Sequence, residues 1–381
     1  MNNNDLSFEE TVFVDGNIYF DALITDISNA KKSIELESYI FANDSVGQKI
    51  SHALIEAAKR GVMVRILVDG AGSPYFATTL AHSLEKAGVQ TRVFHPFPWQ
   101  LWNWSRSVVK WPILLRWIYL FLKSNSRNHR KICIIDKEIA YIGSINITAD
   151  HLHQNKEGLS WRDAAVRFKG ISLKELSESF ESAWFSKTIQ ERMRDTFHRV
   201  KKNPYIRLNN SWHRRRVLYR NLLKRMRRAD HRIWISNAYF VPDNFLLRRL
   251  KLAADYGLDV RVLLPKKSDV FMMPWASEAF YSSLLKSGVR IFEYLPNNLH
   301  AKVLFVDDWI LVGSSNLNYR SILHDLEADA VITKESSKKI LEEQFLKDLQ
   351  NSQEITFDNW KKRPWYQRFS GRALLYLKYW F

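Results

Sequence analysis

The chain contains one pattern of strands and helices twice, and this internal repeat is the strongest constraint on its fold. Each copy reads as strand, helix, strand, helix and strand, beginning at Ala30 in the first copy and at Ala229 in the second. Gly61 and Gly257 stand at matching places where the first helix of each copy should end. This alternation is typical of a mixed or parallel sheet covered by helices. We therefore expect an α/β fold of two similar halves, each a mixed sheet flanked by helices, related by a pseudo-twofold axis.

The repeat also sets the expected domain boundaries. We predict a first half over residues 8–169, a basic helical connector over 170–228 and a second half over 229–350. An aromatic and basic tail, 351–381, completes the chain. The connector contains no Pro/Gly-rich linker, so the two halves should pack against each other rather than swing freely.

Each half carries the same polar motif after its third strand. A His and a Lys stand two residues apart, four apolar residues and an Asp follow, and Gly-Ser-x-Asn comes next. Because alternate residues of a strand share a face, the His and Lys of each half should point the same way. An isolated His-x-Lys is usually an ordinary histidine, but two matching copies favour a site between the halves. The two sets are His129, Lys131, Asp136, Ser144 and Asn146, and His300, Lys302, Asp307, Ser314 and Asn316.

Two imidazoles and two ammonium groups, together with Ser and Asn donors, favour an anionic ligand. The ammonium groups would repel a metal cation, so we expect no metal and no organic cofactor. A phosphodiester fits, because its transition state gains charge that Lys and Asn can stabilise. One His can attack phosphorus, and the other can protonate the leaving alkoxide and then deprotonate the incoming nucleophile. The residues alone do not separate these two roles.

These motifs resemble those of the phospholipase D superfamily. Within it the chain is most similar to the bacterial cardiolipin synthases, especially the shorter type without N-terminal transmembrane helices, over roughly Phe13 to Ile332. Besides the two motifs, the similarity is carried by residues 36–41, 68–73, 161–166, 239–242 and 313–317.

The resemblance implies a phosphatidyltransferase that uses phosphatidylglycerol as donor and acceptor and yields cardiolipin and glycerol. It implies that His129 is the nucleophile that forms a phosphohistidine and that His300 is the general acid and then the base. Asp136 and Asp307 match a motif position that is more structural than chemical in the family. Lys131 and Lys302 would bind phosphate oxygens, assisted by Ser144, Asn146, Ser314 and Asn316.

The same family orients each histidine with a downstream carboxylate on its other ring nitrogen, which fixes the tautomer. Asp163 and Glu327 match, since each opens a strand of alternating residues. Glu157, Asp325 and Asp329 lie close enough in the sequence to be rivals.

The two halves differ by an insertion at residues 97–128, which holds five Trp, five Lys or Arg and no acidic residue. A short apolar helix with Trp and basic flanks suits insertion into one membrane leaflet. The alternative is a helical flap packed on the protein core. The formal charge of +17 favours an anionic partner, either nucleic acid or an acidic membrane surface. Because the basic residues accompany apolar segments long enough to enter one leaflet, we expect anionic phospholipids and a membrane surface as partners and disfavour nucleic acid. The five tryptophans are Trp99, Trp102, Trp104, Trp111 and Trp117.

Several classes of protein are disfavoured. The single cysteine, Cys133, excludes an internal disulfide framework. The N-terminus does not read as a signal peptide, and no run of 18 apolar residues occurs, so we expect a peripheral protein on the cytoplasmic face of the bacterial cell membrane. His151 and His153 lie near the first motif and are candidates for the site, but the start of a solvent-facing helix explains them as well. The rival functions are a phospholipase D hydrolase that gives phosphatidic acid, a nuclease of the same superfamily and a catalytically inactive membrane-binding protein.

Overall fold

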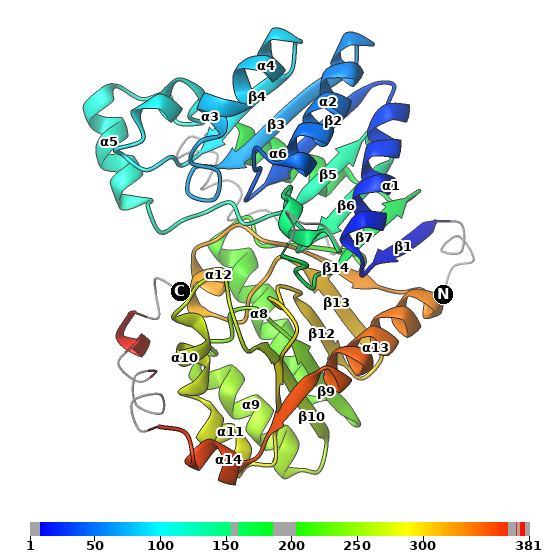
Figure 1. The fold of residues 1–381 in the computed structure, drawn as a ribbon, viewed down its shortest axis with the longest axis vertical. Coiled ribbons are helices and arrows are strands. Elements are labelled where there is room, and N and C mark those ends of the chain that lie inside the picture. Colours follow the sequence, from blue (N-terminus) through cyan, green and yellow to red (C-terminus); the bar gives the residue numbers. More distant parts are fainter. Residues whose placement is uncertain (1–7, 154–158, 186–202, 365–370, 372–373, 378–381) are drawn as a thin grey trace.

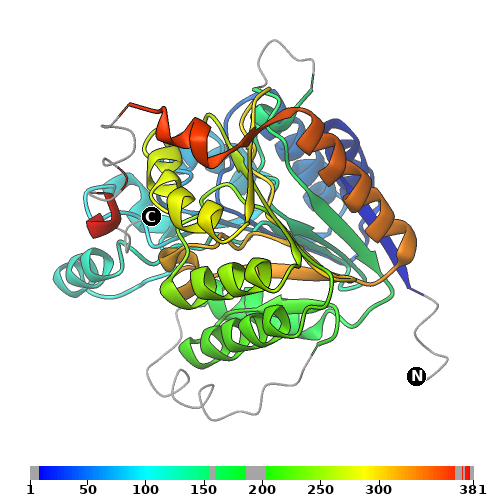
Figure 2. The same ribbon diagram turned by 90° about the horizontal axis from the view of Figure 1, so that it is seen from below.

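The computed structural model describes residues 8–153, 159–185, 203–364, 371 and 374–377. Two mixed β-sheets, one from each half of the chain, lie against each other, and helices cover their outer faces (Figures 1 and 2). The predicted α/β fold of two similar halves is confirmed.

The first sheet has seven strands in the order β1-β7-β6-β5-β2-β3-β4. Strands β2, β3 and β4 are parallel, and every other pairing in this sheet is antiparallel. The parallel strands follow the repeat read from the sequence, with α2 between β2 and β3. The strands are β1 (Glu9–Phe13), β2 (Ser33–Ser38), β3 (Met63–Asp69), β4 (Gln90–Phe94), β5 (Ile132–Ile135), β6 (Ile139–Gly143) and β7 (Ala165–Lys169).

The second sheet repeats this order as β8-β14-β13-β12-β9-β10-β11 and adds β15 beside β11. β8 takes the edge position that β1 takes in the first sheet, so the second sheet includes a strand from the expected connector. Residues 186–202 of that connector lie outside the described residues. The strands are β8 (Ile206–Leu208), β9 (Arg232–Ser236), β10 (Asp259–Pro265), β11 (Arg290–Tyr294), β12 (Val303–Val306), β13 (Trp309–Gly313), β14 (Ala328–Ile332) and β15 (Ser352–Ile355).

The helices fall into matching sets around the two sheets. α1 and α2 pack on the outer face of the first sheet, and α8, α9 and α11 pack on the outer face of the second. The larger helices of the first half are α1 (Gly16–Asn29), α2 (Ser45–Lys59), α5 (Ile113–Leu122) and α6 (Lys174–Trp184). Those of the second are α8 (Trp212–Arg227), α9 (Asn244–Asp255) and α13 (Glu335–Gln350). The shorter helices are α3 (Phe76–Thr79), α4 (Ala81–Lys86), α10 (Met273–Glu278), α11 (Tyr281–Lys286), α12 (Tyr319–Leu323) and α14 (Phe357–Lys361), with 3₁₀ turns at Leu101–Arg106, Ala149–His151 and Leu375–Leu377.

The two halves share one hydrophobic core. Alternate residues of β5 and β12, such as Ile134 and Phe305, point inward and are fully buried together with side chains of β6, β7, β13 and β14. Burial of apolar area on this scale stabilises an interface by about 25 cal/mol per Å². The expectation that the halves pack together therefore agrees with the structure, and the relative position of the two motifs is fixed by this core.

Part of the C-terminal segment packs on the second half. β15 pairs with β11, and Arg363 lies 2.8 Å from the carboxylates of both Glu278 and Glu293. Within the described part of the chain, no helix is both long enough and apolar enough to cross a membrane.

Candidate active site

The two motif segments lie immediately before β5 and β12, and each is bound to the opposite half through its backbone. The amide of His129 donates to the carbonyl of Leu326, at 3.0 Å. The amide of His300 donates to the carbonyl of Arg162, at 2.9 Å. These crossed bonds place both histidines at the boundary between the halves, where the sequence predicted a shared site.

The His129 imidazole is held by the second half. Its Nδ1 atom lies 3.1 Å from both carboxylate oxygens of Glu327 and 3.1 Å from the carbonyl oxygen of Ser314. Both side chains are buried. Since a carboxylate at Nδ1 favours the tautomer with hydrogen on that nitrogen, the lone pair is placed on Nε2.

The His300 imidazole is held in the same way by the first half. Its Nδ1 atom lies 2.8 Å from Oδ2 of Asp163. The two carboxylates predicted from the sequence therefore contact the imidazoles, and each serves the histidine of the other half. Asp325 and Asp329 instead accept hydrogen bonds from the amides of Arg127 and Ser315, and Glu157 lies outside the described residues.

The two lysines are buried beside their own histidines. Lys131 Nζ donates to the carbonyl of His129 at 2.7 Å, and Lys302 Nζ donates to that of His300 at 2.5 Å. Burial lowers the pKa of Lys302 to about 8, and burial and the nearby Lys302 lower that of Lys131. Because burial outweighs the nearby carboxylates and lowers the pKa of both lysines, their charged forms would be stabilised further by a bound anion.

Both imidazoles are neutral at neutral pH. Burial lowers the pKa of His300 to about 4, and the charge of Lys302 contributes to this shift. Burial, followed by Lys131 and Lys302, lowers the pKa of His129 well below its ordinary value. A bound anion would offset the charge of the lysines and raise both pKa values again.

The two orienting carboxylates differ in charge. Burial raises the pKa of Glu327 to about 7, against the opposing effect of Lys131. Burial also acts to raise the pKa of Asp163, but His300 and His151 outweigh it and hold that pKa well below its usual range. Asp163 is therefore ionised beside His300, whereas Glu327 beside His129 titrates near neutrality.

The predicted Ser and Asn donors take different parts. The hydroxyls of Ser144 and Ser314 donate to the carboxylates of Asp163 and Glu327, so they hold these carboxylates instead of pointing at a phosphate. Asn146 uses its Oδ1 to accept the amide of Ile40, and its buried Nδ2 has no protein partner among the described residues. The Nδ2 group of Asn146 can therefore donate a hydrogen bond to an incoming ligand.

Two further residues complete this arrangement, and the sequence interpretation assigned neither a role. His151 is fully buried rather than solvent-facing; its Nε2 accepts the amide of Asn146, and its Nδ1 lies 3.0 Å from Oδ2 of Asp163. In the second half Ser321 accepts the amide of Asn316 and donates to Glu327. Each lies five residues after the Asn of its motif, and this equal spacing is the feature of the sequence that could have identified both residues.

The structure does not bring Asp136 and Asp307 to the histidines. Asp136 begins a turn after β5, where its carboxylate accepts the amides of Lys31, Lys32 and Ser33. Asp307 does the same for residues 230–232. Both have φ near +50°, a conformation that Asp tolerates better than most residues. These aspartates join the motif strand to its neighbour, which agrees with the structural role implied by the resemblance.

The insertion forms a projecting element at the edge of the first half, visible at the left of Figure 1 as α5. Ile113, Leu114 and Leu122 are 74%, 71% and 73% exposed, and Leu120 is the one buried residue of α5. Trp104 is half-buried beneath Arg116. The other four tryptophans, Trp99, Trp102, Trp111 and Trp117, are exposed.

Comparisons with known proteins show the family of the chain. A family model described as "Cardiolipin synthase, PLD-like domain" matches residues 23–184 and 222–349. A cardiolipin synthase of Clostridium perfringens strain SM101 is 32% identical over 96% of this chain and 75% of its own length. One of Geobacillus sp. strain WCH70 is 33% identical over 94% and 70%.

The structural comparison supports the fold. Phosphatidylserine synthase of Haemophilus influenzae Rd KW20 superposes with a TM-score of 0.69 over 97% of this chain and 93% of its own, at 13% identity. The repeated motif, the sequence relatives and the shared fold agree. The chain belongs to the cardiolipin synthase family of the phospholipase D superfamily and is a phosphatidyltransferase.

Proposed function

We propose that this enzyme transfers a phosphatidyl group from one phosphatidylglycerol to a second, releasing glycerol and forming cardiolipin, through a phosphohistidine on His129. The observation that carries the proposal is the pair of buried imidazoles, each held at Nδ1 by a carboxylate of the opposite half, beside two buried lysines.

The first step forms a P–N bond and breaks a P–O bond. The lone pair on Nε2 of His129 attacks phosphorus, and the glycerol oxygen leaves with a proton from His300. Lys131 and Lys302 stabilise the charge that gathers on the non-bridging oxygens. In the second step His300 takes the proton of the acceptor hydroxyl, whose oxygen displaces His129 and restores the free imidazole.

The different carboxylates support this assignment of roles. Asp163 is ionised and stabilises a positive charge on His300, as a proton carrier requires. Because Glu327 titrates near neutrality, it stabilises a positive charge on His129 less than Asp163 does on His300. This difference suits a nucleophile that must be neutral before attack. A phosphodiester anion between the lysines would raise the pKa of His300 from about 4 toward a working value.

We further propose that the enzyme is peripheral on the cytoplasmic face of the bacterial membrane and that the insertion enters one leaflet. Leu120 anchors α5 on the core, but Ile113, Leu114, Leu115, Ile118, Phe121 and Leu122 are exposed, which supports this reading over the flap. Lys110, Arg116 and Lys123 lie next to them in the sequence, and each basic residue near an anionic surface adds about 1 kcal/mol of attraction.

Product analysis tests the proposed reaction. The purified protein would be incubated with phosphatidylglycerol vesicles in the presence of a chelator, and the lipids and glycerol would be quantified by mass spectrometry. The proposal predicts cardiolipin and glycerol in equal amounts. His129→Ala and His300→Ala should each reduce turnover to near background while circular dichroism shows an intact fold.

The alternatives give different products. Phosphatidic acid alone would mean that water is the acceptor and that the protein is a hydrolase. Substantial turnover by either His→Ala variant would contradict the two-histidine mechanism. Salt-sensitive binding and cleavage of DNA, without lipid products, would favour the nuclease.

A further inference from the structure

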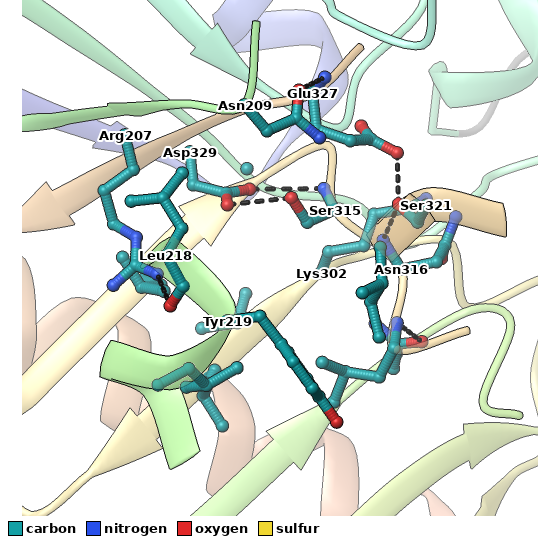
Figure 3. Close-up of a pocket in the computed structure, with 18 of the residues that line it drawn as sticks. Arg207, Asn209, Leu218, Tyr219, Lys302, Ser315, Asn316, Ser321, Glu327 and Asp329 are labelled. Atoms are coloured by element: carbon teal, nitrogen blue, oxygen red, sulfur yellow. Dashed lines mark hydrogen bonds between the residues drawn. The ribbon is translucent and has the colours of Figure 1, made fainter. Parts of the chain in front are cut away.

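The second half contains a cavity, lined by both apolar and polar residues, that no step above uses. It has a volume of about 90 Å³ and lies between α8 and the second sheet, as Figure 3 shows. Lys302, Asn316 and Glu327 belong both to its wall and to the candidate active site. The cavity therefore adjoins the catalytic centre on the side of the second motif.

The residues that line the cavity differ in kind from those at equivalent positions of the first half. Arg207 and Asp329 pair across β8 and β14, where β1 and β7 have Phe13 and Ala165. Ser315 occupies the motif position of Ile145. The first half fills these positions with buried apolar side chains, whereas the second half replaces them with polar ones and leaves space.

A further equivalent pair accounts for part of that space. Leu311 stands two residues before the motif glycine, where the first half has Tyr141. The ring of Tyr141 packs against Phe13 and Tyr19 in the first core. The smaller Leu311 lines the cavity instead.

Four polar atoms of residues that line the cavity have no hydrogen-bond partner among the described residues. They are Ser236 Oγ, Asn316 Oδ1 and the Nε atoms of Arg207 and Arg215, and all four are buried. Ser236 and Asn316 are 3% and 4% exposed. Leaving such groups unsatisfied costs about 1–3 kcal/mol each, so an occupant that forms hydrogen bonds with them would be stabilised in the cavity.

The unpartnered atoms indicate the chemistry of that molecule. The arginine Nε atoms need an acceptor, and Asn316 Oδ1 needs a donor. A hydroxyl group supplies both, whereas a phosphodiester has no hydrogen to donate to Asn316, and any phosphate would lie against the carboxylate of Asp329. The volume is several times what one water requires, so a three-carbon polyol fits in size.

We propose that this cavity binds a small uncharged polyol, and that it receives the glycerol group that leaves during phosphatidyl transfer. The binding of a polyol depends on the cavity alone, whereas the reception of the leaving glycerol rests on the function proposed above. The first half has apolar residues at the positions of Arg207, Ser315 and Asp329, so it has no equivalent cavity lining. Polyol binding would therefore distinguish the second half from the first despite their pseudo-twofold relation.

Binding is tested first with glycerol as the probe and without lipid. Saturation-transfer NMR on the full chain should show saturable glycerol binding. Leu311→Phe, which fills the cavity without changing a polar group, should weaken that binding at least tenfold. Ile145→Val, at the loop position of the first half that corresponds to Ser315, is the matched control and should bind glycerol like the unaltered protein.

The second readout is the partition of products. The acceptor alcohol enters on the side of phosphorus from which the glycerol group has left, so its own glycerol headgroup would occupy the same cavity in the second step. Leu311→Phe should therefore lower the ratio of cardiolipin to phosphatidic acid at least tenfold, because a filled cavity obstructs the acceptor alcohol more than it obstructs water. The triple variant Arg207→Phe/Ser315→Ile/Asp329→Ala, which copies the first half, should do the same if it folds. Both variants would be compared with Ile145→Val in the same assay.

The outcomes separate the two proposals. Saturable glycerol binding that Leu311→Phe abolishes, without any lipid product, would support the cavity and contradict the function. Cardiolipin synthesis with no saturable glycerol signal would mean that the cavity holds water only and would overturn the inference. Saturable binding of inorganic phosphate that Leu311→Phe weakens, without such an effect for glycerol, would overturn it as well.

Discussion

The Nδ1 atom of His129 lies 3.1 Å from both carboxylate oxygens of Glu327, a residue 198 positions later in the chain. Asp163 and His300 form the reciprocal pair at 2.8 Å. Each half thus supplies the imidazole for one side of the site and the orienting carboxylate for the other. Each motif histidine has its carboxylate partner in the opposite half, so we expect activity to depend on the buried interface between the sheets.

Glu327→Gln should reduce kcat by about 10²- to 10⁴-fold, because an amide can stabilise the wrong tautomer of His129 and does not stabilise its cation. Stability should change little, since the raised pKa of Glu327 shows that its neutral form is already tolerated in the fold. Steady-state kinetics and thermal unfolding measure the two effects. Glu343→Gln, exposed on α13, is the matched control. A Glu327→Gln enzyme with normal kcat would remove the orienting role.

His300→Gln should make the free energy of unfolding less dependent on pH below neutrality. The pKa of His300 is about 4 in the folded protein, below its ordinary 6.5, so the unfolded chain takes up the proton first as the pH falls. The stability linked to neutral His300 is complete above pH 6.5 and is lost as the pH falls through 4. Thermal unfolding from pH 7 to pH 4 should therefore show a smaller loss for His300→Gln than for the unaltered protein.

The control for this experiment is His52→Gln, since His52 is exposed on α2. It should follow the profile of the unaltered protein. Equal acid sensitivity in all three proteins would mean that His300 is not held neutral in the fold.

Asp136→Asn should destabilise the protein by about 1–3 kcal/mol, because three backbone amides lose a charged acceptor. Asn tolerates the positive φ at this position, so the turn itself should persist. Urea unfolding measures the loss, and kcat per folded molecule should stay within about twofold because Asp136 does not touch the histidines. A large fall in kcat with unchanged stability would assign this residue to the chemistry.

Replacing Ile113, Leu114 and Leu122 together with Gln should weaken binding to phosphatidylglycerol vesicles at least tenfold. Each of these side chains would transfer about 1.5–3 kcal/mol of apolar burial into the leaflet. Vesicle co-sedimentation measures binding, and the Tm should be unchanged because all three are exposed. Ile18→Gln, on the exposed face of α1, is the control. Unaltered co-sedimentation of the triple variant would exclude α5 as the membrane contact.

The sequence by itself determined the two halves, their mixed sheets and the residues of the paired motifs. These features depend on short-range patterns: the alternation of β5 and β12, the helix-ending glycines and the fixed distance from His to Lys. Local geometry makes such patterns readable, since residues two apart on a strand must share a face. The resemblance to the phospholipase D superfamily rests on the same motifs, and the resemblance to cardiolipin synthases rests on the segments that flank them. The family is confirmed by the relatives.

Only the tertiary structure decided which carboxylate serves which histidine. Asp163 and Glu327 were identified by position, but their exchange between halves results from the packing of one sheet on the other. The burial of His151 and the use of the Ser144 and Ser314 hydroxyls on carboxylates also depend on neighbours distant in sequence. The cavity at Asp329 appears only when β8, β13 and α8 meet, because space between elements is a property of packing that no local pattern encodes.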